Sequence, residues 1–419
     1  MKIKAPRGTN DILPPLSLQW QYIEALARKI LSLYNYQQIR IPIFEYTELF
    51  QRGIGETTDI VEKEMYTFSD KSGRSITLRP EGTASVVRAY LENKIYGKAQ
   101  PVKYYYIGPM FRYERPQAGR YRQFHQLGIE VFGSNDPALD AEVIYLGLNI
   151  LEELGLNDLE AYVNSIGCLQ CRGKYLQKLK EFLNDKQELL CSDCSNRIER
   201  NPLRVFDCKN ENCSMVINGA PRIIDQLCTK CHLHFQKTRD YLDELQVKYT
   251  VDPVLVRGLD YYTNTAFEIK FNKLGAQDTI FAGGRYNGLV KEIGNKSVPG
   301  IGFAIGLERL LLTLEEQGIK VPVKESTDLY VITIGERAKK TAFNFVHKLR
   351  KAGLKAEIDY LDRSVKAQMK AADRINSLYT IILGDNELKE GNATVRNMKN
   401  GEQIEIKLDL LVETMQKMI

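Results

Sequence analysis

The segment from Phe111 to Gly133, FRYERPQAGRYRQFHQLGIEVFG, sets four arginines and two glutamates among aromatic residues and glycines. Its central PQAGR favours a turn, so we expect a β-hairpin. Because side chains alternate between the two faces of a strand, one face of this hairpin is polar. That face carries Arg112, Glu114, Phe124, Gln126, Gly128 and Glu130. The opposite face is mostly apolar and suits packing on helices: Ile107, Phe111, Tyr113, His125, Leu127, Ile129 and Val131.

The polar face of the hairpin has the groups that a phosphate-bearing ligand requires. Arginine donates two hydrogen bonds at once to a phosphate, and Phe124 offers a stacking surface for a base. Gln126 and Glu130 could hold an amine and a polar ring, while Gly128 leaves room for close approach. The face therefore suits phosphates, a purine and a cationic small molecule. A solvated face of ion pairs is the alternative, but such faces are usually mixtures of Lys and Glu.

A second segment whose residues could bind a ligand is SVPGIGFAIGLERLLLTLEEQG. It predicts a glycine-rich strand that runs into an amphipathic helix. Arg309 lies in the first turn of that helix, and helix N-termini attract anions. The segment therefore predicts a second anion-binding element. Tight strand packing is the alternative reason for its glycines.

All eight cysteines lie between Cys168 and Cys231. They form four close pairs, Cys168 with Cys171, Cys191 with Cys194, Cys208 with Cys213, and Cys228 with Cys231. Thiols at CxxC spacing suit tetrahedral zinc, and four pairs could make two sites of four thiolates each. Buried thiols without metal are the alternative.

Composition bounds the class of protein. The 419 residues suggest about three domains, and 43% hydrophobic and 26% charged residues are typical of a globular protein. A net charge of +5 permits a polyanionic partner without demanding one. We see no signal-peptide pattern and no apolar run long enough to span a membrane, so we expect a cytosolic protein whose cysteines are thiols or metal ligands rather than disulfides.

Helical spacing and turn residues predict the elements that position these motifs. An amphipathic N-terminal helix has an apolar stripe at Trp20, Ile23, Ala27 and Ile30. QQIRIPIFEYTELF predicts a strand that runs into a helix, and Pro42 places that strand at an edge or an interface. A mobile loop follows, then a hairpin that turns at residues 71–73 and a helix from about Ala84.

Shifts in pattern divide the chain into four stretches. We expect a catalytic domain in two parts, residues 1–165 and 249–322, with a Cys-rich insertion domain at 166–248 between them. After the polar linker PVKESTD, the apolar runs DLYVITIG, AEIDYL and YTIILG alternate with helical stretches. That alternation predicts a small α/β domain over residues 328–419.

Several motifs resemble those of class II aminoacyl-tRNA synthetases, and of the histidyl-tRNA synthetase family in particular. The hairpin looks like motif 2 of the class, and PGIGFAIGLERLLL looks like motif 3. LRPEGT, which ends at Thr83, and LVRGLDYYTNTAFEI resemble the two histidyl signature segments, while PRGTNDILP and DRSVKAQMKAADR also match the family. The resemblance covers nearly the whole chain. It implies an α+β catalytic domain with a central antiparallel sheet, followed by an α/β anticodon-binding domain.

The resemblance also implies an activity. Similar enzymes join L-histidine to ATP, release pyrophosphate, and move the histidyl group to the terminal adenosine of tRNA(His). Their reaction uses Mg²⁺ on the pyrophosphate oxygens, and they are homodimers with the strand around Pro42 at the interface. Structural zinc is not a property that the resemblance brings, so no metal ligand is assigned and zinc stays open.

By motif position, the ATP-binding residues would be Arg112, Glu114, Arg120, Phe124 and Arg309. Arg112 would hold the α-phosphate, Glu114 would read the adenine amino group, and Arg120 would reach the outer phosphates. Phe124 and Arg309 would sandwich the adenine. With Arg257, the arginines at 112 and 309 would be the catalytic groups, because the reaction brings two anions together and needs charge neutralisation rather than a protein nucleophile.

The histidine-binding residues implied by the same motifs are Glu81, Gly82, Thr83, Arg112, Gln126, Glu130, Arg257, Tyr261 and Tyr262. Glu81 and Thr83 would receive the amino group, and Glu130 the amino and ring side. The alternative for Glu81 is a helix cap, since PEGT is typical of a helix start. His125 lies on the apolar face, and a packed core residue is the favoured interpretation for it.

Two further positions concern the tRNA. In similar enzymes the hairpin turn reads the end of the acceptor stem, where histidine tRNAs carry an extra 5′ guanosine. Arg115 and Gln117 would make this contact, because their side chains can hydrogen-bond a guanine edge. The insertion would lean over the acceptor stem. The family commonly has Asp where this chain has Asn287, so no role is assigned there.

Three rivals remain at this point. The synthetase-like regulatory subunit of ATP phosphoribosyltransferase keeps the catalytic fold but is expected to lack the anticodon-binding domain and parts of the signatures. A class II enzyme for another amino acid is disfavoured by RGLDYY and RPEGT. A zinc-dependent nucleic-acid-binding protein would not need the adenylate motifs.

Overall fold

The computed structural model describes residues 3–56, 58–208, 210–271, 273, 278–323 and 326–419. The chain forms two compact units, Met1–Val321 and Pro322–Ile419. In the part of the chain so described, no helix combines the length and the apolar character needed to cross a membrane.

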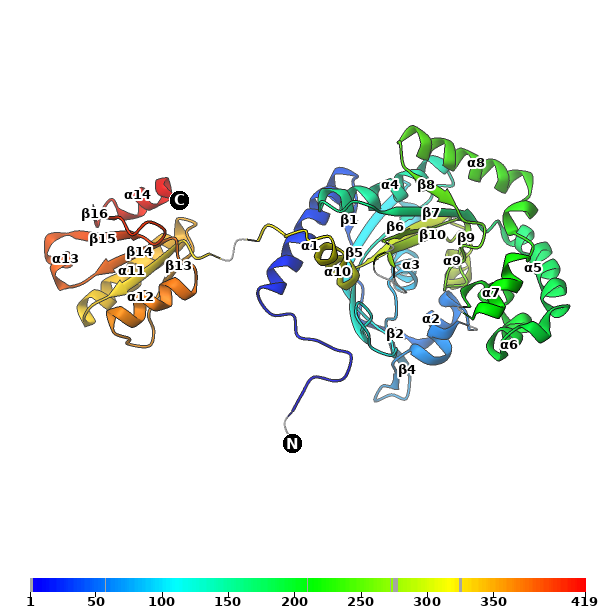
Figure 1. Cartoon of the computed structure of the whole chain (residues 1–419), viewed down its shortest axis with the longest axis horizontal. Helices are drawn as coiled ribbons and strands as arrows, with labels where there is room; N and C mark the ends of the chain where they lie inside the picture. Colours follow the sequence, from blue (N-terminus) through cyan, green and yellow to red (C-terminus); the bar gives the residue numbers. More distant parts are fainter. Residues whose placement is uncertain (1–2, 57, 209, 272, 274–277, 324–325) are drawn as a thin grey trace. The chain divides into compact units, whose positions relative to one another are not determined.

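The larger unit is built on an eight-stranded sheet (Figure 1) in the order β1-β5-β6-β11-β10-β9-β7-β8. Neighbours from β5 to β7 in that order are antiparallel, and the two edge strands β1 and β8 pair in parallel. The expected central antiparallel sheet is confirmed, with parallel edges added. The strands are β1 Gln37–Gln38, β5 Val102–Phe111, β6 Gln123–Phe132, β7 Glu160–Ser165, β8 Tyr249–Val251, β9 Thr263–Lys270, β10 Thr279–Arg285 and β11 Gly300–Gly306.

One face of this sheet packs on helices α1 (Leu16–Leu33) and α4 (Pro137–Glu153) and on α10 (Leu307–Glu316). The predicted stripe of α1 is confirmed, since Trp20, Ile23, Ala27 and Ile30 are all buried. Leu127, Ile129 and Val131 of β6 join the same core, as the alternation of the hairpin predicts. The other face is covered in part by α3 (Thr83–Glu92) and α9 (Leu289–Gly294).

A small sheet in the order β2-β4-β3 stands beside the large one and positions the segment before α3. Its strands are β2 Phe44–Tyr46, β3 Thr67–Ser69 and β4 Ser75–Leu78, and α2 (Thr47–Ile54) follows β2. The predicted hairpin around residues 71–73 is confirmed. The prediction of one continuous strand through Pro42 is wrong, because β1 ends at Gln38 and the next strand begins at Phe44. The segment predicted as a mobile loop contains a π-helical turn, Ile60–Glu64.

The Cys-rich stretch lies between β7 and β8 and is mainly helical. Its helices are α5 Leu169–Asn184, α6 Ser192–Arg200, α7 Glu211–Asn218 and α8 Thr229–Glu244. Figure 1 shows them in green at one side of the sheet. Helix α8 runs beside α4, and its Phe235 and Leu242 are buried in the core of the large sheet. The stretch is therefore built into the larger unit.

The second unit has a five-stranded sheet in the order β13-β12-β14-β15-β16. The first three of these strands are parallel and the last two are antiparallel, which confirms the predicted small α/β domain. Its elements are β12 Leu329–Thr333, α11 Glu336–Lys351, β13 Ala356–Ile358, α12 Val365–Arg374, β14 Tyr379–Leu383, α13 Asp385–Glu390, β15 Asn392–Asn397, β16 Gln403–Lys407 and α14 Leu411–Met418.

Candidate active site

A cavity of about 290 Å³ opens over the polar face of the β5–β6 hairpin. Its wall also includes residues of β10, β11 and α10 and of the irregular segment before β9. The structure brings together, from four separate stretches of sequence, most of the side chains that the motifs single out. The predicted residues that line the cavity are Glu81, Thr83, Arg112, Glu114, Arg120, Phe124, Gln126, Arg257, Tyr261, Tyr262 and Arg309.

Arg112 lies at the centre of this wall. Its Nε donates to the carbonyl oxygen of Pro80 at 2.9 Å, and its guanidinium lies 5.2 Å from the ring centroid of Phe124. Burial lowers the pKa of the Arg112 guanidinium, although nearby carboxylates oppose the shift. Arginine stays protonated even so. Arg112 is thus a positive charge held in place at the cavity wall.

Glu114 and Arg120, which flank the hairpin turn, form an ion pair across the cavity mouth. Glu114 is 9% exposed, and Arg120 also lies 4.0 Å from the carboxylate of Glu64. Glu114 and Arg120 are therefore engaged with each other. A ligand that used both would have to replace this ion pair.

Arg309 connects the start of α10 to two other parts of the site. Its Nε donates to the carbonyl oxygen of Gly119 at 3.4 Å, and one terminal nitrogen donates to that of Thr279 at 3.0 Å. Gly119 has a φ of +68°, a turn conformation that glycine adopts without strain. The arginine predicted from its place in a helix first turn is therefore held against the hairpin turn, at the edge of the cavity.

Glu130 is 1% exposed and lies beneath the cavity floor. Thr83 Oγ1 donates to its carboxylate at 2.7 Å, and the hydroxyl groups of Tyr286 and Tyr106 also contact it. Burial raises the pKa of the Glu130 carboxyl to about 8, despite these hydrogen bonds. Gly302 makes room for it, because a Cβ there would lie 2.2 Å from a Glu130 oxygen.

Glu81 caps a helix, as one interpretation of its sequence context predicted, and it also lines the cavity. Its carboxylate accepts hydrogen bonds from the backbone nitrogens of Thr83 at 2.6 Å and Ala84 at 2.9 Å, which caps helix α3. The same side chain lines the cavity and is 4% exposed. Burial raises the pKa of the Glu81 carboxyl, and the backbone donors oppose that shift. The helix cap fixes the carboxylate in place at the cavity wall.

The gap left by Gly128 has an occupant that the sequence argument missed. Tyr106 is the cross-strand partner of Gly128, and its ring would lie 2.2 Å from a Cβ at that position. A Cβ at Gly82 would lie 2.3 Å from the same ring. The close approach inferred for a ligand at Gly128 was thus wrong, because a tyrosine ring fills the space. The alternation of strand β5 could have found Tyr106, since it shares a face with Arg112.

The segment between β8 and β9 has no regular secondary structure in its described part near Arg257. Arg257 pairs with the carboxylate of Glu268 and lies 5.8 Å from the ring centroid of Tyr262. The rings of Tyr261 and Tyr262 lie 4.7 Å apart and are both buried. This segment supplies one positive charge and two aromatic rings to the cavity.

Besides Gly82 and Glu130, four further positions that the sequence analysis discussed do not line the cavity. Arg115 and Gln117 are exposed in the hairpin turn, as predicted for its tip. His125 packs against Trp20, with ring centroids 4.8 Å apart, and its Nδ1 lies 3.0 Å from a Glu308 oxygen. Tyr113 was expected on the apolar face but is 55% exposed, because strand β5 ends before it.

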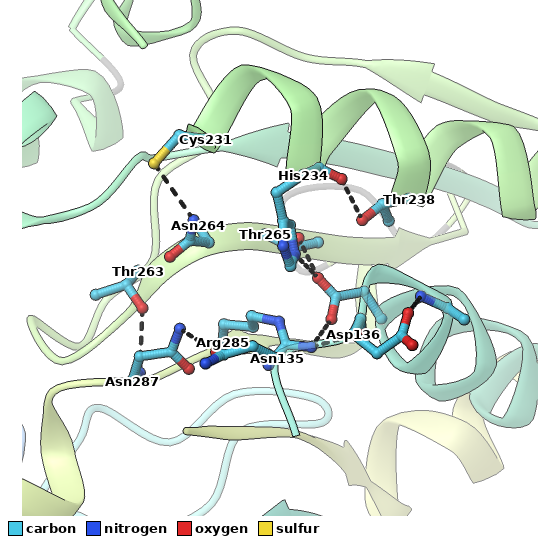
Figure 2. Close-up of polar contacts among 12 residues, drawn as sticks. Asn135, Asp136, Cys231, His234, Thr238, Thr263, Asn264, Thr265, Arg285 and Asn287 are labelled. Atoms are coloured by element: carbon cyan, nitrogen blue, oxygen red, sulfur yellow. Dashed lines mark hydrogen bonds and ion pairs between the residues drawn. The ribbon is translucent and has the colours of Figure 1, made fainter. Parts of the chain in front are cut away.

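A buried charge network behind the site ties four elements together (Figure 2). Arg285 of β10 pairs with Asp140 of α4 at 2.5 Å, and both side chains are fully buried. Thr265 of β9 and His234 of α8 also contact the Asp140 carboxylate, at 2.5 and 2.7 Å. Burial alone would raise the pKa of Asp140, but Arg285 and His234 outweigh it and the pKa is lowered. The network joins β9 and β10 to α4 and α8 through the Asp140 carboxylate.

Asn287 lies beside this network, after strand β10 (Figure 2). Its backbone nitrogen donates to Thr263 Oγ1 at 3.1 Å, and its amide donates to Asn135 at 3.1 Å. Its side-chain oxygen accepts from the nitrogen of Gly300 at 3.3 Å. The residue therefore joins the turn after β10 to its neighbours.

The eight cysteines gather into two clusters. The first contains Cys168, Cys171, Cys228 and Cys231, and the second contains Cys191, Cys194, Cys208 and Cys213. Within each cluster the four sulfur atoms lie within 4.8 Å of one another. Of the four close pairs in the sequence, the first and the last therefore form one cluster, and the two middle pairs form the other.

Comparison with known proteins decides which family has this architecture. The family model described as histidyl-tRNA synthetase matches residues 8–310, and that of the anticodon binding domain matches residues 328–418. The chain belongs to the histidyl-tRNA synthetase family. It is thus a class II aminoacyl-tRNA synthetase, as its motifs predict. The anticodon-binding unit accounts for the second sheet.

Relatives of this synthetase extend over its whole length. It is 69% identical to the histidine–tRNA ligase of Halothermothrix orenii, over 100% of both chains, and 52% identical to that of Clostridioides difficile, also over 100% of both. The crystal structure of apo histidyl-tRNA synthetase from S. aureus superposes with a TM-score of 0.86 at 44% identity and covers 99% of this chain and 100% of that one.

The fold alone does not separate this synthetase from the synthetase-like regulatory subunit of ATP phosphoribosyltransferase. A structure titled ATP phosphoribosyltransferase regulatory subunit/histidyl-tRNA synthetase, from Bacillus halodurans, has a TM-score of 0.65 at 20% identity. It covers 88% of this chain and 97% of that one. At this identity the likeness concerns the fold only. The anticodon-binding domain over residues 328–418, which the regulatory subunit is expected to lack, and the 69% identity to a histidine–tRNA ligase over the whole chain favour the synthetase.

Proposed function

We propose that this synthetase activates L-histidine with ATP and transfers the histidyl group to tRNA(His). The observation that carries the proposal is the cavity whose wall combines the buried Glu81 with four partly buried arginines, Arg112, Arg120, Arg257 and Arg309, above the buried Glu130. A carboxylate pair suits the cationic end of an amino acid, and arginines suit phosphates. The chemistry of both substrates is thus available on one wall.

In the first step, a carboxylate oxygen of histidine would attack the α-phosphorus of ATP, and the bond to the pyrophosphate oxygen would break. Two anions approach each other, so the protein must supply positive charge and alignment. Arg112 and Arg257 line the cavity and would neutralise the charge that develops on the α-phosphate. Mg²⁺ would neutralise the pyrophosphate oxygens.

The ATP side would be formed by the hairpin and α10. The adenine would lie between Phe124 and Arg309, with its amino group donating to Glu114. Because Glu114 is paired with Arg120 in the structure, ATP binding would exchange that ion pair for two ligand contacts. Arg120 would then be free to hold the outer phosphates.

The histidine side would be formed by the floor of the cavity. Glu81, Thr83 and Glu130 would receive the amino group and ring, with Tyr261 and Tyr262 against the imidazole. The Gln126 side-chain oxygen is buried and has no hydrogen-bond partner among the residues described, which supports a ligand contact there. Gly82 would act indirectly, by admitting the Tyr106 ring.

We also propose a homodimer. Phe44 and Tyr46 of β2 are 57% and 53% exposed, and Phe68 of β3 is 49% exposed. These rings lie on the small sheet that follows Pro42, where the motif resemblance implies an interface. Exposed aromatic residues grouped on one small sheet suggest a protein contact. Light scattering of the purified chain should give about twice the 48.0 kDa mass of one chain.

The domain boundaries follow as a proposal. Residues 1–165 and 249–322 would form the catalytic domain, 166–248 the insertion that approaches the acceptor stem, and 328–419 the anticodon reader. Arg115 and Gln117, exposed at the hairpin tip, would contact the acceptor end. Charged tRNA is consumed by ribosomes, so the proposed reaction is cytosolic.

The test is amino-acid-dependent exchange of labelled pyrophosphate into ATP, run with a panel of amino acids. We expect exchange with histidine and not with proline, threonine or glycine. Exchange with another amino acid would replace the proposed substrate. A folded protein with no exchange for any of them would favour the regulatory-subunit rival, which a subsequent assay with the phosphoribosyltransferase could then examine.

A further inference from the structure

The two cysteine clusters have the geometry of metal sites. Cys168 and Cys171 sulfur atoms lie 3.6 Å apart, and those of Cys191 and Cys208 lie 3.8 Å apart. A disulfide would need about 2.0 Å. Four sulfurs at about 2.3 Å from a central zinc ion would be about 3.8 Å from one another in a regular tetrahedron. These two separations match the tetrahedral arrangement, and all four sulfurs of each cluster lie within 4.8 Å of one another.

The surroundings of the sulfurs also suit thiolates. Cys168, Cys191 and Cys228 are the N-cap residues of α5, α6 and α8, so the positive ends of three helices point at the clusters. Backbone nitrogens donate to sulfur as well, from Cys228 to Cys171 at 3.1 Å and from Cys191 to Cys213 at 3.2 Å. These donors offset part of the excess negative charge that four thiolates would leave on a divalent ion.

We propose that this chain binds two structural zinc ions, one in each cluster, with four thiolate ligands apiece. Sulfur-only, tetrahedral and closed sites of this kind are typical of structural zinc. The first ion would join the N-termini of α5 and α8, and its ligands Cys171 and Cys228 are 57 residues apart in the sequence. The second would close the short helices around α6 and α7 into one lobe. Ile198 of α6 and Val216 and Ile217 of α7 are also buried in a hydrophobic cluster with Leu179 and Leu183 of α5, so the ion would add to packing that is already present.

The two sites brace the irregular segment that lines the amino-acid side of the cavity. Arg172, next to the first cluster, donates to the carbonyl oxygens of Asp260, at 3.1 Å, and of Tyr262. From the lobe of the second cluster, Asn201 donates to the Asp260 side chain at 2.8 Å and Arg204 donates to the Gly258 carbonyl. A segment without its own ladder of hydrogen bonds is thus held by the two lobes that the metals would organise.

The first cluster also reaches strand β9 directly. The Asn264 side chain donates to the sulfur of Cys231, on α8, at 3.5 Å. Figure 2 shows this contact beside the one that His234, also on α8, makes with the buried charge network. The backbone of Asn264 is hydrogen-bonded on both sides, to Gly167 and from Ile166. Helix α8 is therefore anchored at its start by the cluster and one turn later by the charge network.

The decisive measurement is the metal content of the full-length protein, purified under reducing conditions without chelator and analysed by elemental mass spectrometry. We expect about two zinc ions per chain. Replacement by Co²⁺ should give the intense visible d–d and thiolate charge-transfer bands of tetrahedral sulfur coordination. Zinc below about one ion per two chains with all thiols free or oxidised, or iron in place of zinc, would overturn the proposal.

Variants assign the ions to the clusters. Cys228→Ser and Cys191→Ser each change a ligand that is not fully buried, so serine should be accommodated. After dialysis against a chelator, each variant should retain about one zinc ion and the wild type two. Gln170→Ala and Ser192→Ala change exposed residues between ligands and should retain two. Equal zinc content in all five proteins would refute the ligand assignment.

The bracing role has its own readout, which does not depend on the proposed activity. Amide hydrogen exchange of the peptide that contains residues 257–264 should become at least about tenfold faster in both ligand variants and remain unchanged in the two controls. If both variants lose an ion and exchange in this peptide stays at the wild-type rate, the metals do not brace the segment.

Discussion

Replacement of Glu130 by glutamine tests the amino-acid side of the site at a single atom. Glutamine keeps the size of the side chain and can still accept from Thr83 and the tyrosine hydroxyls, but it cannot ionise. Burial raises the pKa of Glu130 to about 8, so the carboxyl is mostly protonated at pH 7 in the free protein. If the carboxylate receives a cationic substrate, binding must first remove that proton.

The size of the effect follows from the pKa. At pH 7 a group with a pKa of about 8 is ionised in about one molecule in eleven. The apparent dissociation constant for histidine would therefore be about elevenfold higher than that of the protein in which Glu130 is fully ionised. At pH 8 the penalty falls to about twofold. We therefore expect histidine to bind about fivefold more tightly at pH 8 than at pH 7, with about 0.9 proton released per histidine at pH 7.

Calorimetry in two buffers with different ionisation enthalpies measures both quantities. The Glu130→Gln protein should bind histidine more weakly, release almost no proton from this site, and lose the steep dependence between pH 7 and pH 8. It also serves as the control for ionisation of histidine itself, which is common to both proteins. The same proton release and pH dependence in wild type and variant would refute the assignment.

The same pKa predicts a dependence of stability on pH in the absence of ligand. The folded-state pKa of Glu130 lies above its unfolded value of 4.5, so the protonated side chain favours the folded state at low pH. That contribution is lost as the pH rises toward about 8. The melting temperature of wild type relative to Glu130→Gln should therefore fall between pH 5 and pH 8, and a constant difference would contradict the raised pKa.

Three further predictions concern other parts of the molecule. Arg257→Ala should slow histidine-dependent pyrophosphate exchange by about 10²-fold or more, since it removes a preorganised positive charge; near-normal exchange in a folded variant would exclude it from the mechanism. Arg115→Ala or Gln117→Ala should spare exchange but slow transfer to tRNA, less so on a tRNA without the extra 5′ guanosine; equal loss on both tRNAs would contradict this. Asp140→Asn should lower the stability by about 3 kcal/mol, measured by denaturant unfolding, because it leaves the charge of Arg285 buried without its counterion.

Local pattern was sufficient for elements whose periodicity is strong. The stripe on α1 at Trp20 and its helical neighbours is buried as predicted, because one apolar face leaves a helix few ways to pack. The alternation of β6 likewise placed Leu127, Ile129 and Val131 in the core. Tyr113 did not follow the pattern, because alternation has meaning only while the strand lasts, and β5 ends at Phe111.

Which residues meet across the sheet was decided by tertiary structure. The sequence offered Gly128 as an open gap, but the register of β5 against β6 puts Tyr106 opposite it, and the ring fills the space. In the same way, Tyr286 reaches Glu130 only because β10 and β11 bring their ends together. Cross-strand register depends on pairings between distant segments, which no local pattern encodes.

The cysteines show most clearly what the sequence determines and what only the tertiary structure decides. Their residue type and CxxC spacing in the sequence by themselves determined that thiol chemistry is concentrated in one stretch. Four pairs can combine into two groups of four in three ways, and the sequence contains nothing that selects among them. The packing of α5 against the start of α8, and of α6 against the segment before α7, makes the selection. Sulfur atoms must converge to within a few ångströms to share an ion, and only the folded backbone sets such distances.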